Sequence, residues 1–469
     1  MQRDVFASLS PLDHRYYASE PDLFEQLNSY LSENAYVGYQ LRVEAALTRA
    51  WARHGFCSSS VADEVSRAVA SITPAQVYTE EETTRHSIRA MVNCIRRQVS
   101  RVARPFVHLG ATSSDIMDTA RAMQYRDVTD QVIIPQLKEL LCVLIQITRR
   151  EADTLQVGRT HGQHAVPMTF GFAMAEYISR LGNRTITLEK ATASLCGKMS
   201  GAVGAYNAVS LFLAEPENFE REVLADLGLR PATHSTQITE PEYVLDWAHG
   251  LISTLGVLAN LGDDIRHLQR SEIAEVGEVF AEEQVGSSTM PHKRNPWNFE
   301  HVKSIWKAFC PRMLTLYMDQ ISEHQRDLTN SASQRFVPEI VVALVATTKR
   351  LTRVMRKLVV DRRRMMDNLD LSKEMMVAEP LYVLLAALGH PDAHEVVRQL
   401  TLTAERTGRP LRVVAAESPE LAPYLGQMEQ HHLYLLEHPE TYVGIAAKKA
   451  RNVADHWERV LQLQIGADA

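Results

Sequence analysis

Apolar residues recur at helical spacing over long stretches of this sequence. Pro135 is placed to open a helix, and the stripe after it carries apolar residues at i, i+3, i+7 and i+10 from Leu137 to Ile147. Two further stripes run through Met174–Leu188 and Leu251–Leu268. Such stripes each bury one face of a helix. Strand-like alternation is scarce. The sequence therefore predicts an all-α fold in which long helices pack as a central bundle.

Differences along the chain predict three helical domains. Residues 1–110 indicate shorter helices with polar joints, and residues 111–365 carry the long stripes. Long helices are also expected around 301–321 and 337–360. Residues 366–469 contain more turns and form the third predicted domain.

Composition excludes several classes of protein. The net charge of −7 argues against a nucleic-acid or membrane-surface binder. The five cysteines are scattered and form no CxxC pair, which argues against a disulfide framework or structural zinc and favours the cytoplasm. The N-terminus lacks a signal-type apolar region, and no apolar run approaches the ~18 residues of a membrane span. No metal and no nucleotide cofactor is expected, because zinc-protease, P-loop and Rossmann signatures are incomplete or missing.

The segment of residues 286–296, GSSTMPHKRNP, is the richest in functional groups. It joins two predicted helices and combines hydroxyls with a cation and an amide, Lys293 and Asn295. These two side chains suit an anionic ligand. The segment of residues 159–163, RTHGQ, places His161 at a predicted helix junction beside Arg159 and Gln163. A histidine with such neighbours is a candidate proton donor.

Two more segments supply candidate anion-binding groups. In residues 108–115, HLGATSSD, Thr112 and Ser113 either cap the following helix or bind a carboxylate. In residues 325–331, QRDLTNS, Arg326 together with the later Arg335 suits a phosphate or carboxylate. The alternative for these arginines is a surface set of ion pairs with Asp327. Together the four segments predict a site for a substrate with several negative charges.

These motifs resemble the fumarase/aspartase superfamily, and within it the adenylosuccinate lyase family. GSSxMPxKxNP is the superfamily signature, and its MPHKRNP form narrows the resemblance. Further matches cover nearly the whole chain, at residues 10–16, 84–86, 197–204, 236–237, 325–331 and 378–380. The resemblance implies a three-domain helical fold and a homotetramer with active sites shared between protomers. It also implies β-elimination of fumarate from adenylosuccinate and from the succinyl-carboxamide ribotide of purine synthesis.

The resemblance also implies residue roles. Ser287 resembles the general base, although the residues alone do not exclude Ser288, and His161 resembles the acid that protonates the leaving nitrogen. Glu300 resembles the carboxylate that pairs with that histidine, and His86 a second histidine that binds substrate. The implied substrate-binding residues are Arg15, Tyr16, Arg85, Thr112, Ser113, Gln163, Gln237, Lys293, Asn295, Arg326, Ser331 and Arg335.

One position departs from the family pattern, and other activities remain open. Ser87 stands where the family usually has aspartate after TRH, which alters a possible ribose or base contact. The alternatives are a sister lyase acting on another succinyl amine, an argininosuccinate lyase, a 3-carboxymuconate cycloisomerase, or a catalytically inactive helical scaffold. Retention of Ser287 and His161 argues against the inactive scaffold.

Overall fold

The computed structural model describes residues 7–280, 289, 290 and 292–465. It divides into two compact units. Unit 1 comprises Met1–Leu137, Asn183–Gly256 and Ser304–Lys349, and unit 2 comprises Lys138–Gly182, Val257–Lys303 and Arg350–Ala469. The unit boundaries fall inside long helices, namely α7 (Ile134–Arg150), α8 (Phe170–Ala193), α10 (Glu242–Leu268), α11 (Trp297–Phe309) and α13 (Val337–Arg356). The prediction of a mainly helical fold with long helices is confirmed.

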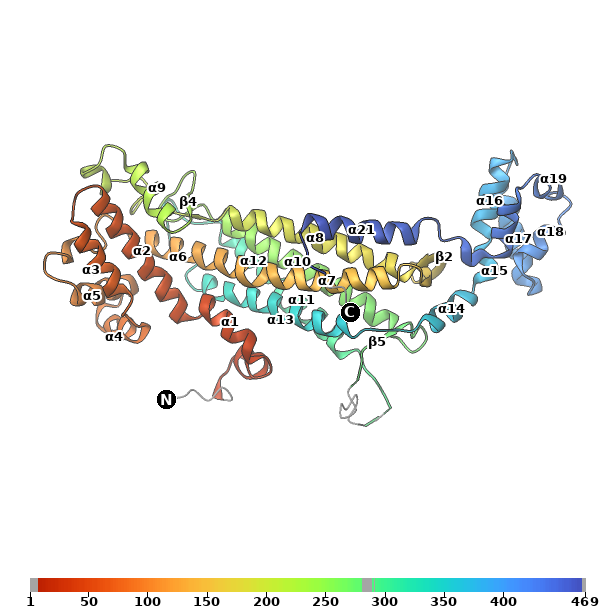
Figure 1. Cartoon of the computed structure of the whole chain (residues 1–469), viewed down its shortest axis with the longest axis horizontal. Helices are drawn as coiled ribbons and strands as arrows, with labels where there is room; N and C mark the ends of the chain where they lie inside the picture. Colours follow the sequence, from red (N-terminus) through yellow and green to blue (C-terminus); the bar gives the residue numbers. More distant parts are fainter. Residues whose placement is uncertain (1–6, 281–288, 291, 466–469) are drawn as a thin grey trace. The chain divides into compact units, whose positions relative to one another are not determined.

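Helix α2 is the central helix of the N-terminal part of unit 1. Helices α3, α5 and α6 supply buried side chains to the same core, and α3 lies beside α2 (Figure 1). Trp51 of α2 lies at the centre of this core, fully buried, and its indole N–H donates to the carbonyl of Leu109 at 2.9 Å. The elements here are a π-helical turn Leu12–Tyr17, α1 (Pro21–Leu31), α2 (Glu33–Arg53), α3 (Ser59–Val69), α4 (Pro74–Thr84), α5 (Ser87–Gln98), a 3₁₀ turn Arg104–Phe106 and α6 (Ser113–Val128).

The helix expected to open at Pro135 does not start from a loop. Pro135 is the second residue of α7, and a π-helical turn, Thr129–Ile133, joins α7 directly to α6. Proline cannot donate a backbone hydrogen bond, and a wider π turn before it accommodates the missing donor within a continuous helical segment. The predicted boundary at Pro135 is therefore wrong, although the apolar stripe after it is confirmed, with Leu137 and Leu144 fully buried.

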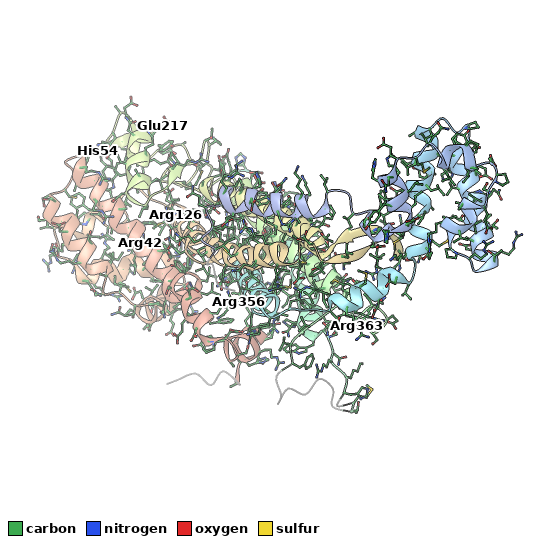
Figure 2. All side chains as sticks on the ribbon, turned by 45° about the vertical axis from the view of Figure 1, so that its right-hand side comes forward. Arg42, His54, Arg126, Glu217, Arg356 and Arg363 are labelled. Carbon is green, nitrogen blue, oxygen red and sulfur yellow. The ribbon has the colours of Figure 1, made fainter. Side chains whose placement is uncertain are left out.

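Arg126, near the end of α6, holds the turn that follows α9. Arg126 on α6 donates to the carbonyls of Leu227 and Gly228 at 2.9 and 2.7 Å, which holds the turn after α9 (Figure 2). The remaining elements are β3 (Cys196–Gly197), a 3₁₀ turn Val209–Leu211, α9 (Pro216–Asp226), β4 (Arg230–Pro231), α12 (Arg312–Met318) and a 3₁₀ turn Ser333–Phe336. The helix expected around 301–321 is broken between α11 and α12, where Pro311 precedes α12.

Unit 2 contains a β-hairpin and the C-terminal helices. The strands β1 (Leu155–Thr160) and β2 (Gln163–Thr169) pair antiparallel, and β5 (Val276–Gly277) pairs antiparallel with β6 (Val359–Val360). The helices are α14 (Arg362–Asp370), α15 (Lys373–Met376), α16 (Ala378–Ala387), α17 (Ala393–Thr407), α18 (Leu411–Ala416), α19 (Ala422–Leu425), α20 (Gln430–Glu437), a 3₁₀ turn Pro439–Thr441 and α21 (Ala446–Val460). A separate apolar core joins α16, α17 and α18, and α17 lies beside both α16 and α18 (Figure 1).

Close helix packing in unit 2 requires a glycine. A Cβ on Gly182 of α8 would lie 2.3 Å from the Trp457 ring of α21, closer than any real contact.

Two helical stretches, Ser113–Arg150 and Glu242–Leu268, are long and apolar enough to cross a membrane by length and composition. The apolar part of each is mostly buried within the protein, as in core helices.

Candidate active site

The start of α6 places the first predicted substrate-binding hydroxyls. Thr112 is the N-cap of α6, and its backbone N–H donates to the Asp115 carboxylate at 2.7 Å. Ser113 is the first helical residue, and both hydroxyl-bearing residues are half-buried. A helix N-terminus presents N–H groups and partial positive charge. Thr112 is therefore the N-cap residue of α6, and Thr112 and Ser113 stand at a position that suits a carboxylate.

A buried ion pair fixes this helix start to the segment of residues 198–204. The ammonium of Lys198 donates to Asp115, and both side chains are 0% exposed. The backbone N–H groups of Ser200 and Gly201 also donate to Asp115, at 3.1 Å and at 3.2–3.3 Å. Asp115 therefore neutralises a buried lysine and satisfies backbone donors at the same time, which is what a buried charge requires.

The loop that carries Gln237 contacts both the segment of residues 198–204 and helix α6. The hydroxyls of Ser200 and Ser235 are 2.7 Å apart, and the Thr239 N–H donates to Asp118 of α6 at 3.1 Å. A Cβ on Gly204 would lie 1.9 Å from the carbonyl oxygen of Ser235, so glycine is required at that position. Unit 1 thus brings Gln237 into the same region as the start of α6.

A cavity of about 560 Å³ in unit 1 collects most of the predicted nucleotide-side residues. Its lining includes Arg326, Ser331 and Arg335 together with Ser87, the position that departs from the family pattern. Within the described part of the chain, the buried Nη1 of Arg326 has no hydrogen-bond partner. A buried guanidinium nitrogen without an acceptor is costly unless a ligand supplies one. The cavity therefore favours an anion.

The alternative of a surface ion pair with Asp327 does not fit the observed contacts. Asp327 instead accepts from the Thr329 hydroxyl at 2.6 Å and from the backbone N–H groups of Thr329 and Glu323, both at 2.9 Å. These hydrogen bonds, with a smaller contribution from Arg326, lower the pKa of Asp327 to about 2. The carboxylate thus closes its own turn and leaves Arg326 available to the cavity.

Sequence reasoning missed Arg121, which lines the same cavity. Its guanidinium donates to the side chain of Gln334 and lies 5.5 Å from the centre of the Tyr36 ring. Asp118, one turn earlier on α6, is half-buried, and loss of contact with water raises its pKa despite the nearby charge of Arg121. The sequence did contain a signal for Arg121: Asp118 and Arg121 stand three residues apart in a mainly apolar helix, where charged residues are uncommon unless they are paired or functional.

The TRH segment forms the junction between α4 and α5. Arg85 adopts the left-handed conformation with φ 52°, and His86 is the N-cap of α5. The Nδ1 of His86 accepts from the Arg89 N–H at 3.3 Å, so the neutral ring carries its proton on Nε2. Both side chains are exposed. Arg15 and Tyr16 lie in the π-helical turn before α1, and neither is among the described residues that line the cavity.

His161 lies in the connection between two helices, as predicted, but this connection is the β1–β2 hairpin of unit 2, and His161 occupies its tip. Thr160 pairs with Gln163, so His161 and Gly162 form a two-residue turn with φ 54° and 74°. Positive φ at both central residues is the pattern of a type I′ turn, which matches the twist of a hairpin. The tip and Gln163 are exposed. Arg159 binds the buried Glu275 at 2.6 Å and is therefore not a free anion-binding neighbour of His161.

The segment that follows residue 288 leads into α11 of unit 2. The N–H of Lys293 donates to the carbonyl of Met290 at 2.9 Å, and Lys293 is exposed while Asn295 is half-buried. Glu300 lies exposed in the first turn of α11. Glu278 fixes the helix start by accepting from the Asn298 amide at 2.6 Å. Ser287 and Ser288 lie outside the described residues.

The site residues are therefore divided between the two units. Unit 1 carries Arg15, Tyr16, Arg85, His86, Thr112, Ser113, Gln237, Arg326, Ser331 and Arg335, and unit 2 carries His161, Gln163, Lys293, Asn295 and Glu300. Among the described residues, no group of three or more histidine, cysteine, aspartate or glutamate side chains is arranged to hold a metal ion.

Comparison with known proteins gives matches over nearly the whole chain. The family model described as "Lyase" matches residues 14–308, and the model described as "Adenylosuccinate lyase C-terminal" matches residues 322–430. The chain is 36% identical to the adenylosuccinate lyase of Pyrococcus horikoshii over 461 residues, which covers 97% of this chain and 99% of that protein. It is 34% identical to the corresponding protein of Pyrococcus abyssi, with 97% and 99% coverage.

Solved structures share the fold. The 3-carboxy-cis,cis-muconate lactonizing enzyme of Pseudomonas putida superposes with a TM-score of 0.79 at 27% identity, covering 93% of this chain and 97% of that one. A fumarate lyase from Mesorhizobium sp. BNC1 gives a TM-score of 0.80 at 25% identity, covering 92% and 97%.

Proposed function

Since the chain belongs to the adenylosuccinate lyase family, whose members act in purine biosynthesis, we propose that it cleaves adenylosuccinate to AMP and fumarate by β-elimination, using the residues that the resemblance implies. The observation that best supports this substrate is the buried Nη1 of Arg326, which faces a cavity without a protein acceptor. A nucleotide phosphate supplies the missing acceptor, and Arg335 and Ser331 add a second cation and a hydroxyl.

The reaction needs a base, an acid and a grip on the succinyl carboxylates. Ser287 takes the β-proton, the carbon–nitrogen bond breaks as the carbon–carbon double bond forms, and His161 gives a proton to the leaving nitrogen. Negative charge develops on the adjacent carboxylate as the proton leaves, so fixed donors such as Lys293 and Asn295 stabilise the transition state more than the substrate. Glu300 pairs with His161 in this assignment, and His86 binds the substrate.

Thr112, Ser113 and Gln237 bind the succinyl carboxylates in this proposal. The hydrogen bonds of Asp115 and Lys198 support it, because they hold the start of α6 rigidly. The succinyl-carboxamide ribotide carries the same ribose phosphate and succinyl groups, and we propose that it is cleaved at the same site. Arg15, Tyr16, Arg85 and Gln163 complete the proposed substrate contacts.

Competition by products tests the phosphate contact directly. AMP and adenosine differ only in the phosphate, so the ratio of their inhibition constants reports on its binding. We expect Arg326→Met to weaken inhibition by AMP by at least ~30-fold, corresponding to the lower end of the roughly 2–5 kcal/mol for a buried charge pair, and to leave adenosine unchanged. Arg363→Met is the matched control, because its side chain is 91% exposed (Figure 2). An unchanged ratio of the two inhibition constants in Arg326→Met would show that the phosphate does not bind in this cavity.

We further propose a homotetramer whose active sites are shared between protomers. An exposed apolar surface in unit 1 supports association. Leu314, Tyr317 and Met318 occupy one face of α12 with 65%, 42% and 72% exposure, and Ile321 follows with 80% exposure. Apolar side chains gathered this way mark an interaction surface.

The five cysteines are unpaired, which supports the proposed cytoplasmic location.

Complementation tests the shared site. Inactive His161→Ala and inactive Ser287→Ala proteins are mixed, dissociated gently and reassembled. If the two segments of one site come from different protomers at random, about a quarter of the sites regain both native residues and activity rises to that fraction. Mixed oligomers that stay inactive would place His161 and Ser287 of each site in one chain.

A further inference from the structure

A fully buried carboxylate lies beside strand β1 of the hairpin that carries His161. Glu275 is 0% exposed. Its Oε1 accepts from Arg159 Nη2 at 2.6 Å and from the Asn368 amide at 2.9 Å, and its Oε2 accepts from Arg159 Nη1 at 3.2 Å and from the Gln156 amide at 2.7 Å. The arginine contact is bidentate, the geometry that fixes a guanidinium most firmly.

These contacts join three segments of unit 2. Gln156 and Arg159 belong to β1, Asn368 belongs to α14, and Glu275 lies between α10 and β5. The backbone supports the same junction, because the Asp361 N–H donates to the carbonyl of Glu275 at 2.9 Å. Arg364 of α14 also donates to the carbonyls of Glu272 and Ile273, at 3.0 and 3.2 Å. Glu275 therefore anchors β1 to a rigid neighbourhood.

The chain adopts an unfavourable conformation next to Glu275. Ala274 has φ 53°, in the left-handed region that costs an L-residue roughly 1–2 kcal/mol. Such a conformation persists only where the surrounding contacts over-determine it. The hydrogen bonds that Glu275 accepts from β1 and α14 lie directly beside this residue in the chain.

The anchored residue is close to the hairpin tip. Arg159 pairs with His164, and a single further pair, Thr160 with Gln163, separates it from the turn at His161 and Gly162. A strand advances about 3.3 Å per residue, so His161 lies roughly 7 Å along the chain from Arg159. Within the described part of the chain, the His161 imidazole has no hydrogen bond or ion pair. Its placement consequently depends on the hairpin backbone.

From this arrangement we propose that Glu275 is a positioning residue for His161: through Arg159 it fixes the hairpin so that the imidazole meets the leaving nitrogen. The proposal rests on the proton-donor role proposed for His161. A general acid contributes only when it is held within hydrogen-bonding reach of its partner, and a displacement of about 1 Å can cost ~10²-fold in rate. Glu275 touches no substrate in this role.

The matched pair Glu275→Gln and Glu151→Gln tests this role. Glutamine keeps the size of Glu275 but loses the bidentate acceptor for Arg159, so kcat should fall by about 10–100-fold while KM changes less than about threefold. Glu151 is equally buried in the same unit and accepts from Arg150 and Arg362, each at 2.9 Å. Its replacement should lower Tm but leave kcat within about twofold. Arg159→Lys keeps the charge without the fork and should show an intermediate loss of kcat.

A double-mutant cycle separates this proposal from the one it rests on. In a His161→Asn background, where asparagine tolerates the positive φ, adding Glu275→Gln should change the residual kcat less than about twofold. An undiminished loss in that background, or a Glu275→Gln enzyme with native kcat, would overturn the positioning role. Native kcat in His161→Asn alone would instead overturn the proton-donor role. If Glu275→Gln fails to fold, native kcat in both Arg159→Lys and Asn368→Ala overturns the positioning role.

Discussion

Replacing Lys198 with methionine removes the cation from a buried ion pair and leaves its anion in place. Lys198 and Asp115 are both 0% exposed, and the Lys198 ammonium also donates to the carbonyl of Gly201 at 3.1 Å. Methionine has a similar length and fills the space, so the main loss is electrostatic. The Asp115 carboxylate then stays buried beside backbone donors alone.

The expected cost follows from what Asp115 retains. Breaking a buried ion pair by removing one partner typically destabilises a protein by about 3–5 kcal/mol, because the other charge is left uncompensated. Asp115 keeps hydrogen bonds from the backbone N–H groups of Thr112, Ser200 and Gly201. These donors offset part of the loss, so we expect a value near the lower limit, about 3 kcal/mol. That is a large share of the roughly 5–15 kcal/mol of a typical domain.

Equilibrium unfolding in urea, followed by circular dichroism, measures the change in the free energy of unfolding. Lys198→Met combined with Asp115→Asn should recover part of the loss, since no unpaired charge then remains buried. KM for adenylosuccinate should rise in the single variant, because Asp115 holds the start of α6 where Thr112 and Ser113 lie. A single-variant loss below about 1 kcal/mol, or a double variant less stable than the single, would refute this reasoning.

Three further outcomes are expected. Ser287→Ala should lower kcat by at least ~10²-fold in a folded protein while Ser288→Ala is milder, and the reverse ranking in steady-state kinetics would move the base to Ser288. Burial lowers the pKa of His108, but the charge of Glu44 and the hydrogen bond to it outweigh burial and raise that pKa above 6.5. Protonated His108 therefore stabilises the folded state fully below pH 6.5, and this stabilisation is lost as pH rises through the raised pKa. The difference in unfolding free energy between the native protein and His108→Gln should consequently narrow with rising pH. A difference that widens would contradict this assignment. Dialysis against EDTA should leave activity intact, and a loss restored by a divalent ion would show a metal requirement.

The apolar stripes predicted the helical fold because helical periodicity is a local property of the sequence. The hairpin at Leu155–Thr169 was missed because its turn is His161–Gly162 rather than an Asn-Gly or Asp-Gly pair, and because Pro167 lies within the second strand. Its short strands also lack a clean alternation of buried and exposed residues.

Partners distant in sequence could not be predicted from local patterns. Arg159 was assigned to an anion-binding neighbourhood because its partner Glu275 stands 116 residues away. Lys198 was recognised only as part of a motif, and its burial against Asp115 emerges from tertiary packing across 83 residues. In contrast, Arg326 and Ser331 were predicted as anion-binding residues from a cluster of suitable side chains within a few positions of the sequence, and both line one cavity.

Turnover of adenylosuccinate by the purified chain tests the central claim most directly. Nuclear magnetic resonance follows substrate, AMP and fumarate in one sample without a coupling enzyme. The chain should consume adenylosuccinate and release AMP and fumarate in equal amounts, and Ser287→Ala should slow both products together. No release of fumarate from adenylosuccinate, with turnover of 3-carboxy-cis,cis-muconate in a parallel sample, would contradict the account.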